Sequence, residues 1–130
     1  MTVLPVTLCL AAAAAAVNIW LGTRIGKLRG SLKVSVGDGG QEPLVRRMRA
    51  QANFIEQVPL TLALVAAVEL AGKGGQWLAP AAAIFVAGRI CHAVGMDGNF
   101  KAGRPIGMLT AMLLQLVLAV VAVLAAVGKI

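Results

Sequence analysis

Two stretches of this sequence, residues 3–21 and 106–127, contain no charged side chain. Each is close to the roughly 20 residues that an α-helix needs to cross a hydrocarbon core about 30 Å thick. Two further stretches are apolar over a similar length although they carry ionisable residues, and glycine-rich turns separate all four. We therefore predict an all-α fold, an integral membrane four-helix bundle forming a single domain over residues 1–130, with spans at about residues 3–23, 44–71, 77–96 and 105–127.

The overall composition favours the same class and excludes others. Hydrophobic residues make up 59% of the chain and charged residues 13%, against roughly 45–50% and about 25% in soluble domains. A soluble monomer of this size could not bury so much apolar surface, and disordered chains are poor in apolar residues. The net charge of +7 also occurs in nucleic-acid-binding proteins, but these are not usually so hydrophobic, and we expect no nucleic-acid partner.

Basic residues are concentrated on one side of the predicted membrane. Lys101 and Arg104 lie between the last two spans, whereas the opposite side holds Lys73 and Lys129. The positive-inside rule then places the first and third loops in the cytoplasm and both termini on the other side. Attraction to anionic lipid is the simplest further role of such a loop. The basic residues between the first two spans are Arg24, Lys27, Arg29, Lys33, Arg46, Arg47 and Arg49.

Polar side chains also recur at helical spacing inside the second and third spans. Intervals of three and four residues place them on one helix face, and ionisable residues within a span indicate function by default. Gln51 points to nearly the opposite side of the second span. Arg104 lies near the start of the fourth span, at about the same membrane depth as the polar residues of the second and third spans. The aligned residues are Arg46, Arg49, Asn53 and Glu56 in the second span and Arg89, His92 and Met96 in the third.

These residues allow two interpretations. A purely structural network would pair Glu56 with Arg49 or Arg89 and tie the helices together. Alternatively, the excess of guanidinium groups suits a ligand with several carboxylates, with Asn53 and Glu56 receiving its amide and amino groups. The apolar helices nearby would then supply a lipophilic second substrate from the membrane. The two cysteines lack a metal-ligand spacing, and no metal is expected.

The segment Arg49-Ala50-Gln51-Ala52-Asn53-Phe54-Ile55-Glu56-Gln57-Val58-Pro59 resembles the second-helix signature of the MAPEG family, the membrane-associated proteins in eicosanoid and glutathione metabolism. Its form is most similar to the leukotriene C synthase and microsomal glutathione transferase branch and to bacterial members. Residues 88–95, Gly-Arg-Ile-Cys-His-Ala-Val-Gly, are similar to the third-helix stretch of the family. The length, the four spans and the basic first loop agree along nearly the whole chain.

This resemblance implies a homotrimer with glutathione, as co-substrate, bound between subunits at the cytoplasmic side. Arg24 and Gln51 would reach the site of the neighbouring subunit, and Arg104 would lie next to the glutathione sulfur. Family enzymes commonly have a tyrosine where this chain has Met96, and the chain contains no tyrosine. Any thiolate would then be stabilised by the charge of Arg104. One subunit would contribute the remaining ligand residues, which are Arg49, Asn53, Glu56, Arg89 and His92.

The function expected from the resemblance is that of a glutathione-dependent transferase or peroxidase acting on lipophilic electrophiles or lipid hydroperoxides, for example in detoxification. The alternative is a non-catalytic lipid-binding or scaffold member of the same family, which the missing tyrosine favours. A small drug exporter is disfavoured because the first span lacks the carboxylate that such proteins require. The resemblance to bacterial members also implies a multi-pass protein of the bacterial inner membrane.

Overall fold

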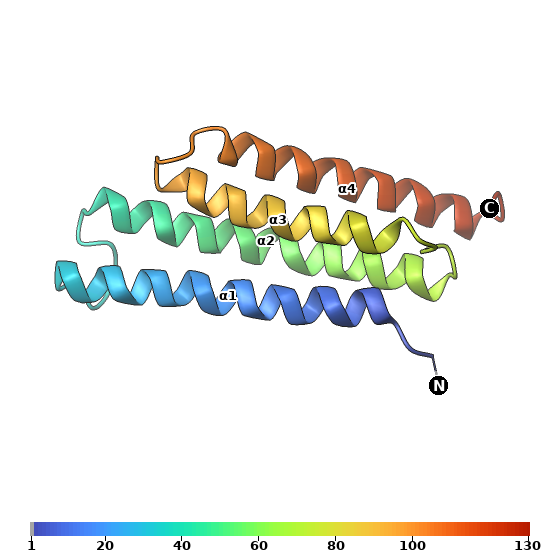
Figure 1. Cartoon of the computed structure of the whole chain (residues 1–130), viewed down its shortest axis with the longest axis horizontal. Coiled ribbons are helices and arrows are strands. Elements are labelled where there is room, and N and C mark those ends of the chain that lie inside the picture. The colour runs from blue at the N-terminus through green and yellow to red at the C-terminus, as the bar shows by residue number, and fades with distance from the viewer. Residues whose placement is uncertain (1) are drawn as a thin grey trace.

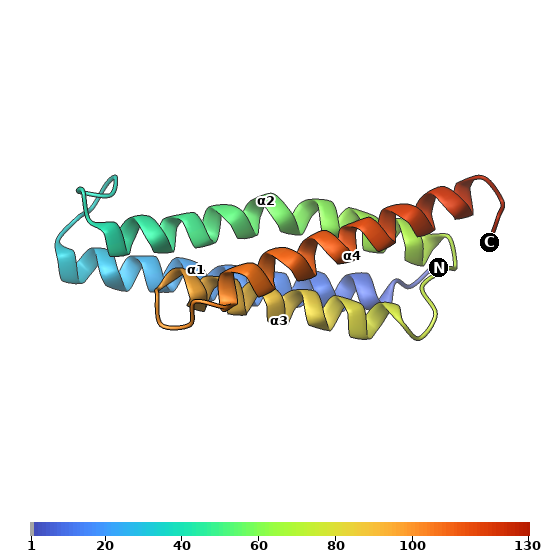
Figure 2. The same ribbon diagram turned by 90° about the horizontal axis from the view of Figure 1, so that it is seen from above.

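The computed structural model describes residues 2–130, and within that range the chain forms four α-helices. They are α1 (Pro5–Leu32), α2 (Glu42–Leu70), α3 (Leu78–Met96) and α4 (Gly103–Ala126). Successive helices run in opposite directions along a common long axis (Figure 1), and Figure 2 shows the same bundle from above. All four are long and apolar enough to cross a membrane. The predicted all-helical fold, with four helices long and apolar enough to span a membrane, is therefore confirmed.

The first helix continues well past the predicted end of its span. α1 has a proline in its first turn, where the missing N–H is tolerated, and it runs beyond residue 23 to Leu32. The connection to α2 is limited to residues 33–41. Most basic residues between the first two spans therefore lie on helices, where their positions relative to the bundle are fixed. They are Arg24, Lys27 and Arg29 on α1, and Arg46, Arg47 and Arg49 on α2.

Two clusters of buried apolar side chains hold the bundle together. One lies toward the chain termini and contains the fully buried Val65, Phe85 and Leu118. The other lies toward the opposite end and contains Leu21 and Phe54. α1 packs on α2 and α3, and α4 packs on α3 and α2. Over the described residues, α1 and α4 thus occupy opposite corners of the bundle.

Glycines allow α3 and α4 to approach each other closely. A Cβ atom at Gly107 would lie 2.5 Å from the Gly88 carbonyl oxygen and 2.5 Å from the Cβ atom of His92. A Cβ atom at Gly95 would lie 2.5 Å from the backbone nitrogen of Arg104. These separations leave no room for a side chain. The first turns of α4 are therefore held against the last turns of α3.

The opposite end of the bundle has a polar contact between α1 and α2. Leu4 provides no side-chain cap for α1. Instead, the Glu69 carboxylate in the last turn of α2 accepts hydrogen bonds from Val6 N at 2.9 Å, Thr7 N at 2.9 Å and Thr7 Oγ1 at 2.7 Å. An acceptor with negative charge suits the unsatisfied amides and positive dipole end of a helix N-terminus. Glu69 therefore caps a helix other than its own.

Candidate functional site

A cavity of about 400 Å³, called the site cavity below, opens between α2, α3 and α4. It lies in the half of the bundle that holds the 33–41 and 97–102 loops. All but two of its lining residues belong to the polar patterns noted in the sequence; the additions are Ala52 and Met108. The lining consists of Arg49, Ala52, Asn53 and Glu56 of α2, His92 and Met96 of α3, and Arg104 and Met108 of α4.

Regular helix geometry explains how each side chain reaches this cavity. Arg49, Asn53 and Glu56 follow at intervals of four and three residues and share one face of α2. His92 and Met96 are one turn apart on α3. Arg104 lies in the first turn of α4, where the close α3–α4 contact holds it near α3. The three faces converge because the helices pack on one another.

The charged groups of the site cavity are not used to neutralise one another. Arg49, Glu56 and Arg104 are exposed, and none of them takes part in an ion pair within residues 2–130. The pairing of Arg49 with Glu56 that a structural network would need is not present. Two guanidinium groups and one carboxylate therefore face the same open space. Such a surface can bind an anion that also carries one cationic group.

Arg89 lies behind the cavity rather than in its lining. Its residue is only 3% exposed. One terminal nitrogen donates to Asn53 Oδ1 and the other to the carbonyl oxygen of Gly107. A buried guanidinium needs such acceptors to compensate for its loss of hydration. In this structure Arg89 fixes the Asn53 side chain and joins α3 to both α2 and α4.

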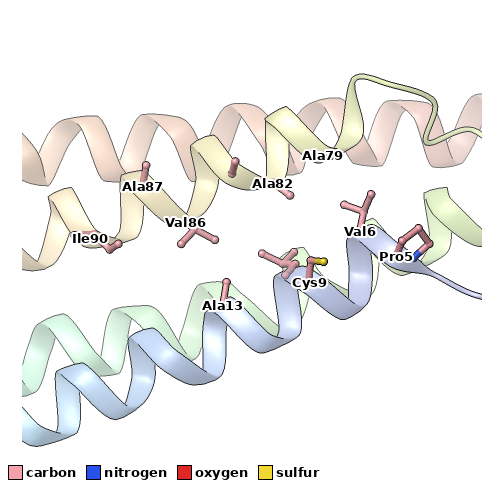
Figure 3. Close-up of a pocket in the computed structure, with 11 residues that line it drawn as sticks. Pro5, Val6, Cys9, Ala13, Ala79, Ala82, Val86, Ala87 and Ile90 are labelled. Atoms are coloured by element: carbon pink, nitrogen blue, oxygen red, sulfur yellow. The ribbon is translucent and has the colours of Figure 1, made fainter.

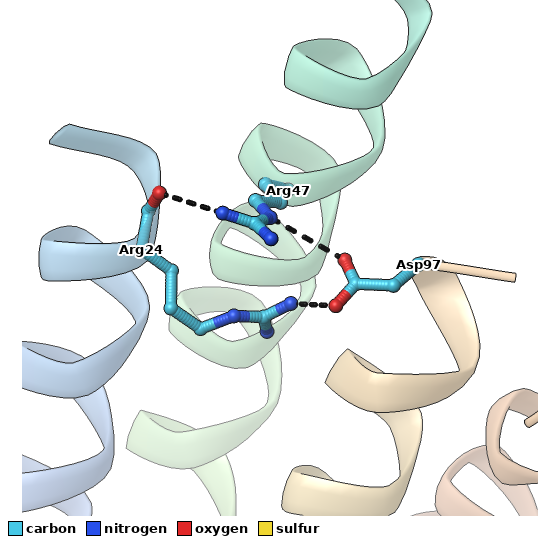
Figure 4. Close-up of polar contacts among 3 residues, drawn as sticks. All are labelled: Arg24, Arg47 and Asp97. Atoms are coloured by element: carbon cyan, nitrogen blue, oxygen red, sulfur yellow. Dashed lines mark hydrogen bonds and ion pairs between the residues drawn. The ribbon is translucent and has the colours of Figure 1, made fainter. Parts of the chain in front are cut away.

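Arg24 and Gln51 lie away from the site cavity. Arg24 of α1 forms an ion pair with Asp97, and Arg47 approaches the same carboxylate at 3.5 Å (Figure 4). Arg47 also donates to the backbone oxygen of Arg24 at 3.0 Å. Gln51 donates to Asn18 Oδ1 on α1 at 3.3 Å. Within one chain, Gln51 therefore contacts α1, and Arg24 pairs with the residue that follows α3.

Arg46 is also absent from the site cavity, although it shares the sequence spacing of Arg49. Its Nε and Nη2 atoms donate to Glu42 Oε1 at 3.0 and 2.6 Å, an i, i+4 pair on α2. It lines a different polar cavity, at the end of the bundle. Asp97 is a functional candidate that the sequence patterns missed. It is the acidic residue that directly follows α3, and its partners come from α1 and α2.

A larger cavity, of about 530 Å³, lies between α1 and α3 and has a different character. Figure 3 shows its wall of small and apolar side chains, with Cys9 and Ala13 on α1 facing Val86 and Ile90 on α3. Its lining includes no charged side chain. This apolar groove can accept a hydrocarbon group, but it offers no residue for acid–base or electrostatic catalysis.

Comparison with known protein families identifies the family of this chain. The model of the MAPEG family matches residues 7–124, which is nearly the whole chain. The chain belongs to the MAPEG family. "Inner membrane protein YecN" from Escherichia coli strain K12 is 28% identical over 82 residues, as is the protein of that name from E. coli O6:H1. The alignment covers 63% of this chain and 63% of each relative, so the match extends over less than two thirds of the relatives' own length.

MAPEG membership and the four spanning helices establish a multi-pass membrane protein. The MAPEG family includes glutathione-dependent transferases and peroxidases. The site cavity lies within the matched range and has the charge balance for an anionic peptide with a free amino group. Met96 and Met108 form part of its lining, and these soft, apolar side chains can contact a thiol or a hydrocarbon.

Proposed function

We propose that this protein is a glutathione-dependent membrane transferase or peroxidase that acts on lipophilic electrophiles or lipid hydroperoxides. The observation that carries the proposal is the site cavity, in which Arg49, Arg104 and Glu56 face one space without pairing to one another. Membership of a family that contains glutathione-dependent enzymes supports the same function.

Several residues of the cavity are suitable partners for groups of glutathione. Each of its two carboxylates requires a cationic partner, and Arg49 is available in the same chain for one of them. Its amino group requires an acceptor with negative charge, which Glu56 supplies. Asn53 can bond a peptide group, and Arg89 holds its side chain in place. His92 contributes a further polar surface from α3.

Arg104 is the proposed catalytic residue. A guanidinium beside the glutathione sulfur stabilises the thiolate, which is the nucleophilic form. In the transferase reaction, the thiolate attacks an electrophilic carbon, a C–S bond forms and the leaving group departs with the electron pair. In the peroxidase reaction, the thiolate attacks the terminal oxygen of the hydroperoxide, an S–O bond forms and the O–O bond breaks. The products are a glutathione sulfenic acid and an alkoxide, which takes a proton from water to become the alcohol. A second glutathione then yields the disulfide and water.

The proposed assembly is a homotrimer with its sites at the cytoplasmic side. Arg24 and Gln51 lie on the α1 side of each chain, away from that chain's own cavity. In a trimer they would complete the site of the neighbouring subunit, as the family resemblance implies. The first and third loops would face the cytoplasm, and both termini the opposite side. The bacterial inner membrane is the proposed location, which the similarity to an inner membrane protein supports.

A second candidate function is lipid binding or scaffolding without catalysis. The observation that favours it is Met96, which lines the site cavity where family enzymes commonly have tyrosine. A methionine cannot donate a hydrogen bond to a sulfur. Under this function, glutathione would not bind and the cavity would serve a different ligand.

The decisive experiment measures glutathione conjugation with a generic aromatic electrophile in detergent, together with the thiolate absorbance of bound glutathione. For Arg104→Ala we expect about a 100-fold loss of kcat/KM and a smaller thiolate fraction, because one pre-organised cationic group is removed from the sulfur. Arg104→Lys should retain more thiolate than Arg104→Ala, since it keeps the charge. Lys101→Ala removes a charge from an exposed loop position and is the matched control.

The results separate the two functions. An unchanged thiolate fraction in Arg104→Ala would eliminate the electrostatic mechanism. If wild-type protein shows no thermal shift with millimolar glutathione, the non-catalytic function is favoured instead. Circular dichroism of each variant establishes that the helices are intact.

A further inference from the structure

A second polar cavity, called the rim cavity below, has a volume of about 400 Å³ and lies where α2 begins and the 97–102 loop crosses the bundle. It shares no lining residue with the site cavity. None of the proposed glutathione ligands lines it, although one of them, Arg24, pairs with Asp97 in its wall. Its walls come from three parts of the chain: Leu28 of α1, Glu42, Pro43, Arg46 and Arg47 of α2, and Asp97 and Asn99 after α3.

Hydrogen-bond donors outnumber acceptors around the rim cavity. Three guanidinium groups, those of Arg24, Arg46 and Arg47, share the carboxylates of Glu42 and Asp97. Each guanidinium retains donor atoms without an acceptor within residues 2–130. Arg46 Nη1 has no hydrogen bond, and Arg24 Nη1 is buried without a partner. The cluster therefore keeps a net positive charge, and Arg46 and Arg47, which line the cavity, have donor atoms free to bind a ligand.

The other walls suit a ligand with an apolar part. Asn99 adds an amide to the polar side, whereas Leu28 and Pro43 form an apolar side. The cavity lies where the membrane-spanning helices end, and we expect this depth to be that of the bilayer headgroups. Arginine clusters at this depth recognise phosphate through charge-assisted, often bidentate, hydrogen bonds.

From this geometry we propose that the rim cavity is a binding site for a phosphate group, with Arg46 and Arg47 as its ligands. The phosphate of an anionic phospholipid headgroup and free inorganic phosphate present the same chemistry to these guanidinium groups. The apolar wall of Leu28 and Pro43 suits the glycerol portion of the lipid. The backbone oxygen of Arg24 and the carboxylate of Asp97 hold Arg47 in position.

The test titrates the protein in neutral detergent with dioleoylphosphatidylglycerol, dioleoylphosphatidylcholine or inorganic phosphate, and counts bound molecules by native mass spectrometry. Wild type should bind one phosphatidylglycerol saturably and phosphatidylcholine about tenfold more weakly, because the choline ammonium is repelled by the arginines. Arg46→Ala should weaken phosphatidylglycerol binding about tenfold, since a charge-assisted contact to phosphate is lost. Displacement by inorganic phosphate would identify free phosphate as a ligand, and resistance to displacement would identify the lipid; both results support the site.

Two further variants distinguish specific binding in the rim cavity from general attraction of anionic lipid to basic residues. Lys27→Ala removes the same charge from an exposed position of α1 outside the cavity and should change the affinity less than about twofold. Asn99→Phe keeps every charge but fills the cavity, and it should weaken binding as strongly as Arg46→Ala. Equal losses in Lys27→Ala and Arg46→Ala, undiminished binding in Asn99→Phe, or equal affinity for the two lipids would each overturn the proposal. Glutathione thermal shifts, measured in parallel, report on the site cavity separately.

Discussion

Arg89 connects all the helices that surround the site cavity, although it does not line the cavity itself. From α3 it donates to Asn53 on α2 and to the backbone of Gly107 on α4. Because the guanidinium is buried, its charge must be compensated by these acceptors. Its role in this structure is to orient Asn53 and fix the helix packing. A substitution at Arg89 would therefore alter the site through its neighbours.

Asp97 has a comparable role at the end of the bundle, where it separates two arginines. It pairs with Arg24 and Arg47, and its side chain is 20% exposed. We expect Asp97→Asn to lower the free energy of unfolding by about 1–2 kcal/mol, because two cationic groups lose their shared anion. Thermal unfolding followed by circular dichroism in detergent would measure the change.

The control for Asp97→Asn is Asp38→Asn. Asp38 is exposed in the 33–41 loop, and its carboxylate accepts a hydrogen bond from Gly40 N at 2.8 Å. Asp38→Asn should lower the midpoint of thermal unfolding much less than Asp97→Asn does. Equal shifts in the two variants would show that the Asp97 carboxylate adds nothing specific.

At the scale of elements, the contact between α3 and α4 decides where the site residues lie. Any side chain at position Gly107 would clash with the backbone of Gly88 and the side chain of His92. We expect Gly107→Ala to destabilise the protein by about 2 kcal/mol or more, because α4 must move away from α3. The same movement would separate Arg104 from His92, so glutathione-dependent stabilisation should also fall. Thermal unfolding with and without glutathione measures both effects.

Gly26→Ala is the matched control for Gly107→Ala. Gly26 lies within α1, and a Cβ atom there would meet nothing within 4 Å. Alanine is a better helix former than glycine by about 1 kcal/mol, so this variant should be as stable as wild type or more so. Destabilisation by both substitutions to a similar extent would contradict the close-packing explanation.

Sequence patterns located the helices and one polar face on each of the second and third spans, but not the rotation of one helix against the next. Hydropathy was sufficient to predict the four spans, and helical spacing correctly grouped Arg49, Asn53 and Glu56 on one face of α2. The same spacing grouped Arg46 with them, although Arg46 pairs with Glu42 and lines a different cavity. The Arg24 pair could not be anticipated because Asp97 is 73 residues away in the chain. Only tertiary packing determines such partners.

Over the whole molecule, much of the outer surface is apolar and available to lipid or to other subunits. α4 contacts α2 and α3 on one side, and its other side presents large apolar residues. Within residues 2–130 this face has no partner, which agrees with a protein that is surrounded by membrane or by neighbouring subunits. The exposed residues of this face are Leu109, Met112, Leu113, Leu116, Val117, Val120 and Val123.

The proposed trimer makes a prediction that only the assembled molecule can test. Arg24→Ala and Arg104→Ala chains, carrying different affinity tags, are co-expressed, and mixed trimers are isolated through both tags. If a site takes Arg104 from one subunit and Arg24 from the next, every mixed trimer contains both arginines at one of its sites, which is about a third of the sites. Conjugation activity should therefore exceed that of either variant alone. No recovery in mixed trimers that bind glutathione would contradict a site shared between subunits.

The cap that Glu69 provides has a consequence for how the chain is made. The amides of Val6 and Thr7 bond to a carboxylate that follows them by 63 and 62 residues. During synthesis, the amides in the first turn of α1 have no Glu69 acceptor until the end of α2 has left the ribosome. Until then they must donate their hydrogen bonds to water. The pair of α1 and α2, rather than α1 alone, is thus the smallest segment in which the N-terminal end of α1 has its hydrogen-bond acceptors during co-translational insertion.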